Sequence, residues 1–222
     1  FYMEKKKIIK GIIFIVLIVI FVIAINTERN FIIVKNMQNK ISNYNKSTNF
    51  SAKISQNESD ETKVDINYYK KDNKQAVILE RTDANNEKVT MKEYDNGETT
   101  NIYWETKDEK KAQLNKNALI SVEVYNELET DNDWQTFLAC IFARIKSTNY
   151  NGKECYVVTN YMSPLFIYED ENHVAYIDKS TGISVKSILG EMTTEKEYDF
   201  NNVDDSVFNE PDANEYVVEN NN

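Results

Sequence analysis

Side chains able to do covalent or metal chemistry are few and scattered in this chain of 222 residues. The chain has one histidine, His173, and two cysteines, Cys140 and Cys155. One imidazole and two distant thiols cannot supply a four-ligand zinc site, and no serine or cysteine nucleophile motif accompanies the histidine. With 5 glycines the chain also lacks a phosphate loop or dinucleotide fingerprint. We therefore expect no catalytic residue, no metal and no cofactor.

The charge balance excludes a further class of partner. The chain carries 26 basic and 36 acidic side chains, a net charge of -10, which repels nucleic acid. Acidic side chains cluster at residues 131–133 and 169–171, but neither spacing matches a calcium-binding loop. We expect a helix N-cap at the first cluster and a solvated turn at the second.

Residues 8–25 form an apolar run, IIKGIIFIVLIVIFVIAI, broken only by Lys10 and Gly11. A run of this length predicts one transmembrane helix, because only a helix satisfies its own backbone groups within about 30 Å of hydrocarbon. Lysines precede the run, so we expect residues 1–7 in the cytoplasm and the remainder outside. A cleaved signal peptide is the alternative, for which Ala24-Ile25-Asn26 is a poor cleavage site. The Lys-, Asn- and Ile-rich composition suggests a Gram-positive bacterium.

An extracytoplasmic location allows a disulfide between Cys140 and Cys155. Closing a loop of about fifteen residues would contribute on the order of 3 kcal/mol to stability. Two buried free thiols are the alternative, because cysteine also packs as a small hydrophobic residue. Both possibilities stay open from the sequence.

The pattern of apolar residues changes along the rest of the chain. Residues 26–48 carry apolar side chains at three- and four-residue steps, as in an amphipathic helix beside the membrane. From residue 49 the period becomes two, which predicts strands joined by polar turns such as Asn96-Gly97. The strands are expected near residues 50–54, 64–68, 76–79, 89–91, 102–104, 112–114, 155–159, 165–168, 173–178, 183–189 and 193–200. Residues 117–128 fit strand or helix equally.

An apolar stripe interrupts the strands between residues 134 and 145. Its members recur at helical spacing after the N-cap candidates Asp131, Asn132 and Asp133, which predicts a helix of three turns. Runs of strands broken by such an insert indicate an α+β fold, with a curved antiparallel sheet covered by helices. The helix would cover the sheet and leave an apolar cavity suited to acyl chains. Alternatively, its side chains simply fill a packed core.

The C-terminal part resembles a known family. Tyr176 to Gly182 (YIDKSTG), Glu197 to Val203 (EYDFNNV) and Asp205 to Pro211 (DSVFNEP) are similar to the ending of LolA-like proteins, the lipoprotein carrier superfamily. The helix followed by strands over residues 31–54 is similar as well. The resemblance implies an incomplete antiparallel barrel wrapped around helices over residues 49–217, with a tail at 218–222. It also implies an extracytoplasmic protein that carries lipoproteins, binds lipids or senses envelope stress.

We therefore expect a membrane-anchored binding protein that holds a lipid or an acylated lipoprotein segment. A freely diffusing carrier is not expected, because the chain is tethered. The candidate cavity residues are Trp134, Phe137, Leu138, Ile141, Phe142, Phe166, Tyr168 and Tyr176. The candidates for contacting a lipid head group are Arg81 and Arg144. The alternative is an envelope sensor or interaction ectodomain with a packed core, which binds an unidentified protein through its acidic surface.

Overall fold

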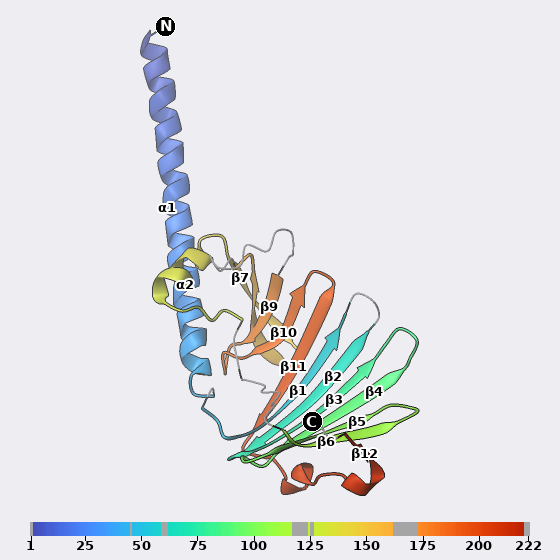
Figure 1. The fold of residues 1–222 in the computed structure, drawn as a ribbon. Coiled ribbons are helices and arrows are strands. Elements are labelled where there is room, and N and C mark those ends of the chain that lie inside the picture. The colour runs from blue at the N-terminus through green and yellow to red at the C-terminus, as the bar shows by residue number, and fades with distance from the viewer. Residues whose placement is uncertain are drawn as a thin grey trace.

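The computed structural model describes residues 2–44, 46–58, 62–116, 124, 127–161 and 173–219. A long helix leads into a large, curved and unclosed antiparallel sheet, and a short second helix lies beside the first (Figure 1). The expected α+β class with an incomplete barrel is confirmed. The elements are α1 (Tyr2–Ile41), β1 (Asn49–Asn57), β2 (Lys63–Lys71), β3 (Lys74–Thr82), β4 (Lys88–Asp95), β5 (Thr100–Glu105), β6 (Lys110–Lys116), α2 (Asp133–Cys140), β7 (Arg144–Tyr150), β8 (Lys153–Thr159), β9 (His173–Asp178), β10 (Ser184–Leu189), β11 (Met192–Phe200), the 3₁₀ turns η1 (Asp205–Phe208) and η2 (Ala213–Glu215), and β12 (Val217–Val218).

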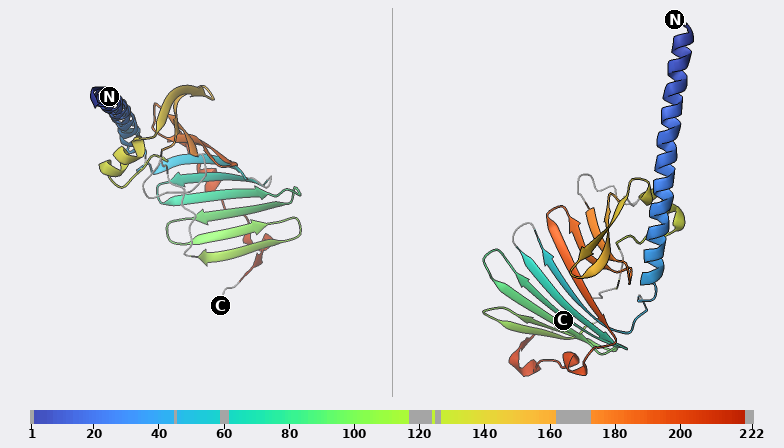
Figure 2. Two further views of the ribbon diagram at one scale, coloured as in Figure 1. Left: turned by 90° about the horizontal axis from the view of Figure 1, so that it is seen from above. Right: turned by 180° about the vertical axis from the view of Figure 1, so that it is seen from behind.

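The sheet consists of two meanders joined side by side. Its strand order is β12-β6-β5-β4-β3-β2-β1-β11-β10-β9-β8-β7. The strands β1 to β6 pair sequentially, as do β7 to β11, and the pairing of β1 with β11 unites the two meanders. The short β12 adds to β6 in parallel. The views in Figure 2 show how the sheet bends away from α1.

The helix α1 has two halves with different surroundings. Its large apolar side chains from Ile12 to Ile25 are exposed, between 41% and 66%. After Ile25, the side chains of Thr27, Asn30, Val34, Met37 and Ile41 are buried at three- and four-residue steps. These steps follow the amphipathic pattern that the sequence predicts, but the helix ends at Ile41, before the predicted limit of residue 48. Over Lys10–Ile41 the helix is long and apolar enough to cross a membrane, with a mean hydropathy of 2.6 in its best window.

The second half of α1 packs on one face of the sheet, which we call the helix face. Val34 and Met37 join a core with Val158 and Ile177 of the second meander. Further along, Ile41 packs with Phe50, Ala52 and Tyr68 of the first meander. The chain between β9 and β10 comes so close that a Cβ on Gly182 would lie 2.3 Å from the Met37 carbonyl oxygen. Gly182 also has a positive φ of 77°, so glycine is required there twice over.

The other side of the sheet, which we call the opposite face, has its own cover. Over the first meander, Tyr94, Tyr103 and Ala112 are buried beneath the C-terminal segment, from which Phe208 and Tyr216 pack onto them. The rings of Tyr103 and Tyr216 meet edge to face at 5.0 Å. The segment from Phe208 to Tyr216 therefore serves as a structural cover for this face.

The helix predicted over residues 134–145 is wrong in length and in the face that it buries. The helix α2 ends at Cys140, and Ile145 lies on β7, opposite Val158 of β8. Residues 144–150 form a strand of the β7–β8 hairpin in place of a helix, because Asn151 and Gly152 both adopt positive φ and form a tight turn between the two strands. The buried side chains of α2 are Thr136, Ala139 and Cys140.

The two cysteines are free and buried, so the structure has separate thiols in place of the disulfide. Cys140 belongs to the core under α1. Cys155 alternates with Tyr156 and Val158, which pack against that same core, so its side chain points to the opposite face. Burial raises the pKa of Cys140 to about 12, and burial together with the charge of Asp178 raises that of Cys155. Both thiols are therefore unreactive.

Candidate functional site

A row of five apolar side chains crosses the helix face of the first meander. Ile54, Ile66, Leu79, Met91 and Trp104 lie directly opposite one another on β1 to β5. Each of the five is partly exposed. Four steps between neighbouring strands give this apolar row a length of about 19 Å. It is an extended apolar surface that the fold leaves partly accessible.

The apolar row borders the core on one side and a row that carries one exposed cation on the other. The next row on the same face, formed by Ala52, Tyr68, Val77, Glu93 and Ile102, is buried. On the other side, Arg81 is exposed between Val64 and Val89 in the register of the sheet. A ligand lying on the row would therefore meet one exposed cation at its outer edge.

A buried ion cluster marks the end of the apolar row at β11. Lys196 pairs with Ile54 in the sheet, and its side chain is 2% exposed. Its Nζ donates to Glu127 Oε1 at 2.8 Å, and His173 Nε2 lies 3.2 Å from Glu127 Oε2. Burial alone would raise the pKa of Glu127, but the contacts with His173 and Lys196 outweigh it and lower the pKa to about 2. Glu127 is thus held as a carboxylate, which fits a structural role.

This cluster was not found by sequence analysis, which left His173 as a strand residue without a partner. The available signal was the alternation of Thr194, Lys196 and Tyr198, which places a lysine on the apolar face of its strand. A lysine there needs a buried carboxylate. Nothing in the sequence identifies Glu127 as that carboxylate, because it is 69 residues away.

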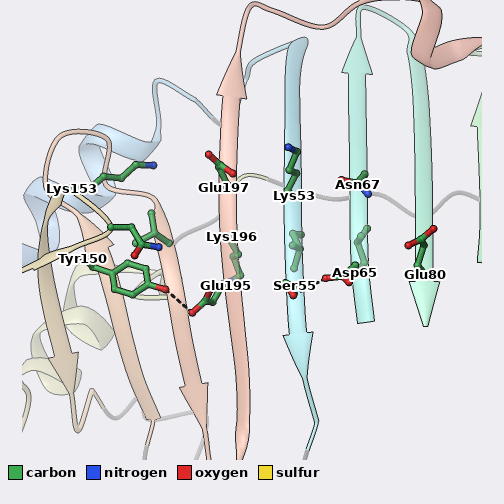
Figure 3. A pocket seen from close by; sticks show the side chains of 14 residues that line it. Lys53, Ser55, Asp65, Asn67, Glu80, Tyr150, Lys153, Glu195, Lys196 and Glu197 are labelled. Carbon is green, nitrogen blue, oxygen red and sulfur yellow. Dashed lines mark hydrogen bonds between the residues drawn. The ribbon is translucent and has the colours of Figure 1, made fainter. Parts of the chain in front are cut away.

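A pocket of about 520 Å³ lies on the opposite face, where the tip of the β7–β8 hairpin folds over β11, β1 and β2 (Figure 3). Its labelled lining is charged with both signs, including Lys53, Asp65, Lys153 and Glu197. At one side the Tyr150 hydroxyl donates to Glu195 at 2.6 Å. Such a lining suits a polar ligand and does not match a cavity for an acyl chain.

The structure separates the residues predicted to share one apolar cavity. Trp134, Phe137 and Phe142 are exposed beside α1, and Leu138 and Ile141 are half-buried next to them. None of these five belongs to the apolar row. The cavity lid was expected from periodicity, but α2 packs on α1 through its small residues and leaves its large ones outside.

The remaining candidates are dispersed. Tyr176 lies on the opposite face, with its ring 5.3 Å from that of Tyr150. Arg81 lies beside the apolar row, whereas Arg144 is exposed at the start of β7, close to α2. Phe166 and Tyr168 lie outside the described residues. The members of the apolar row were recognised from sequence only as strand residues, because their alignment across five strands depends on register.

Comparisons with known proteins give no family. No family model matches the sequence, and no curated protein is similar to it. Among solved structures, an uncharacterized conserved protein from Thermus thermophilus is similar with a TM-score of 0.43 and 12% identity, over 83% of this chain and 98% of that one. The structure of MucB in complex with MucA(peri) is similar with a TM-score of 0.36 and 11% identity, over 84% of this chain and 62% of that one. A DUF1329 family protein from Desulfovibrio piger is similar with a TM-score of 0.31 and 9% identity, over 83% of this chain and 97% of that one.

Proposed function

We propose that this protein is a membrane-anchored, LolA-like ectodomain that binds an apolar ligand, a lipid or the acyl group of a lipoprotein, on its apolar row. The N-terminus lies in the cytoplasm, and the sheet lies outside the cell membrane. The protein holds its ligand without chemical conversion. This assignment combines the family-like C-terminal motifs with the curved, unclosed sheet and its N-terminal helix.

The exposed half of α1 supports the anchor. From Ile12 to Ile25 its large apolar side chains are each at least 41% exposed in the described part of the chain. In water this surface would be costly at about 25 cal/mol per Å². In a bilayer this surface contacts lipid chains in place of water. The lysines that precede it favour a cytoplasmic N-terminus.

The partial exposure of the apolar row is the observation that carries the ligand assignment. An isolated exposed leucine is ordinary, but the five aligned side chains of the apolar row form a continuous apolar surface. Its length of about 19 Å matches an extended long-chain acyl group, because the steps between strands set the span. Arg81 lies beside Leu79 on the middle strand of the apolar row, where it would contact the anionic head group of a ligand whose acyl chain covers one half of the row.

Lipid extraction from the purified full-length protein tests this assignment, with two neighbouring variants. Leu79→Asp puts a charge in the apolar row, whereas Ile78→Asp puts the same charge on the opposite face of the same strand. We expect wild type and Ile78→Asp to retain lipid at a fixed stoichiometry and Leu79→Asp to lose it. Equal retention by both variants would refute the apolar row as the site.

A protein partner is the second candidate, and the charged pocket on the opposite face is the observation that favours it. Lys53 and Glu197 project there from adjacent strands, as a polar interface would require (Figure 3). If the purified protein carries no lipid, crosslinking in intact cells from Lys53 would identify such a partner. Crosslinks that persist in Leu79→Asp would support this function over lipid binding.

A further inference from the structure

Exposed aromatic side chains gather around α2, away from the sheet. Trp134, Phe137 and Phe142 are 66%, 37% and 65% exposed. Trp134 stacks on Phe137 with the ring centres 5.9 Å apart, and Phe137 meets Phe31 of α1 at 6.0 Å. We call these four residues the aromatic foot. Such a cluster marks an interaction surface.

Contacts with α1 fix the position of the aromatic foot along that helix. At the start of α2, Asp133 accepts an ion pair from Lys35 at 2.8 Å. At its end, Asn30 Nδ2 donates to the carbonyl oxygens of Cys140, at 3.3 Å, and Ala143, at 2.7 Å. Residues 133–143 therefore run antiparallel to α1, and their end points back toward the apolar span (Figure 1). Phe142 lies at that end.

The level of Asn30 corresponds to the surface of a bilayer. Ile25 ends the apolar run, and five residues of helix place Asn30 about 7.5 Å beyond it. The head-group region of a bilayer adds about 5 to 7 Å to each side of the hydrocarbon. Phe142 therefore lies at the edge of the head groups when Ile25 lies at the edge of the hydrocarbon. An average helix tilt of about 20° toward α2 would immerse it.

The charged residues around α2 are also distributed unequally between its two ends. The acidic Asp133 lies at the end far from the apolar span, where it pairs with Lys35. At the near end, the exposed Arg144 and Lys146 alternate with the buried Ile145 on β7. Cations at the end that approaches the membrane favour anionic head groups, and tryptophan and phenylalanine suit the boundary between lipid and water.

We propose that the aromatic foot contacts the bilayer that α1 crosses through its near end, where the exposed Phe142 inserts into the outer head-group layer. This second membrane contact fixes the tilt of α1 and thereby the orientation of the sheet and of its apolar row. The proposal rests on the membrane anchoring of α1 proposed above, but it does not require a ligand on the apolar row. It assigns Phe142, which the sequence placed in a cavity, to the membrane surface.

Tryptophan quenching tests this contact once the 2 native tryptophans, Trp104 and Trp134, are replaced by phenylalanine and a single tryptophan is placed at position 142. The full-length Trp104→Phe, Trp134→Phe, Phe142→Trp variant is reconstituted into vesicles of phosphatidylcholine and phosphatidylglycerol that carry bromine at shallow or deep acyl positions. We expect the tryptophan at position 142 to be quenched, and more strongly by the shallow bromines. The Trp134→Phe variant reports Trp104 separately, and quenching there would reflect lipid on the apolar row.

A matched pair of variants links the quenching to the aromatic foot. With both native tryptophans replaced by phenylalanine, a tryptophan placed by Leu189→Trp, at an exposed leucine on β10, should not be quenched. A tryptophan at position 142 that is not quenched in a protein resistant to alkaline extraction would overturn the membrane contact of the aromatic foot and leave the anchor standing. A protein released by alkaline extraction would overturn both the anchor and the foot.

Discussion

The two faces of the first meander are both apolar, but they are closed in different ways. On the opposite face, Tyr94 and Tyr103 are buried beneath Tyr216 of the C-terminal segment. On the helix face of the same strands, Met91 and Trp104 stay partly exposed. Because strand alternation supplies both faces equally, the difference lies in the cover and not in the sheet. A closed face stabilises the fold, and a partly open one is available to a ligand.

Charged pairs on β11 show the same contrast between faces. Lys196 on the helix face is 2% exposed and pairs with Glu127, whose side chain is 10% exposed. Its neighbour Glu195 points to the opposite face and pairs with Lys186 at 2.9 Å, where its side chain is 48% exposed. Two ion pairs of similar length therefore differ in how much water surrounds them.

Removing one lysine from each pair should give the largest difference between the faces. Lys196→Met leaves a buried carboxylate without its cation and should lower the free energy of unfolding by about 3 to 5 kcal/mol. Lys186→Met removes a solvent-screened partner and should cost at most about 1 kcal/mol. Urea unfolding of the full chain in micelles, followed by circular dichroism, measures both. Equal losses of unfolding free energy in the two variants would show that the two ion pairs do not differ in this way.

Truncating one aromatic residue on each face compares a closed cover with an open track. Tyr216→Ala removes a buried ring that packs on Tyr103, and we expect a loss of about 3 kcal/mol in unfolding free energy. Trp104→Ala removes a partly exposed ring and should cost about 1 kcal/mol. Only Trp104→Ala should reduce the lipid retained by the protein. Unchanged stability of Tyr216→Ala, or unchanged lipid retention by Trp104→Ala, would contradict this difference between the two faces.

Acid should weaken the helix face through Glu127. The fold lowers the pKa of this carboxyl from 4.5 to about 2, so its contribution is complete above pH 4.5 and is lost as the pH falls through 2. Between pH 7 and pH 3 we expect a loss of about 2 kcal/mol that depends on this residue. Unfolding free energies of wild type and Glu127→Gln should converge over this range. Parallel pH curves for the two proteins would rule the explanation out.

The smallest expected effect concerns the cation beside the apolar row. Arg81→Gln should leave the unfolding free energy within about 0.5 kcal/mol, because the side chain is exposed. It should weaken binding of a fatty acid by a few fold, corresponding to about 0.5 to 1 kcal/mol. Lys53→Gln, which removes an exposed cation from the opposite face, is the control. Equal affinities for both variants would remove Arg81 from the site.

Much of the fold follows from local patterns in the sequence. The period-two alternation located most of the strands because one face of each is buried, and His173–Asp178 was predicted with its observed bounds, whereas Arg144–Tyr150 was missed. The three- and four-residue steps after Ile25 likewise predicted the buried side of α1. These signals depend on which residues are neighbours in the chain.

The site depended on long-range arrangement and was largely missed. The apolar row exists only because five strands align in one register, and the pairing of Lys196 with Glu127 joins residues that are distant in sequence. The stripe from Trp134 was assigned to a lid because periodicity shows an apolar side without showing what covers it. Arg81 was selected by residue type alone, and the register places it beside the row.

Photocrosslinking from the two faces of β4 would show directly whether lipid lies on the apolar row. A photoreactive amino acid replaces Met91, in the apolar row, or its neighbour Lys92, which points to the opposite face. After irradiation of intact cells, mass spectrometry of the purified full-length protein identifies what each position captured. We expect lipid or acyl adducts at position 91 and none at position 92. Lipid adducts at both positions, or only at position 92, would contradict this expectation.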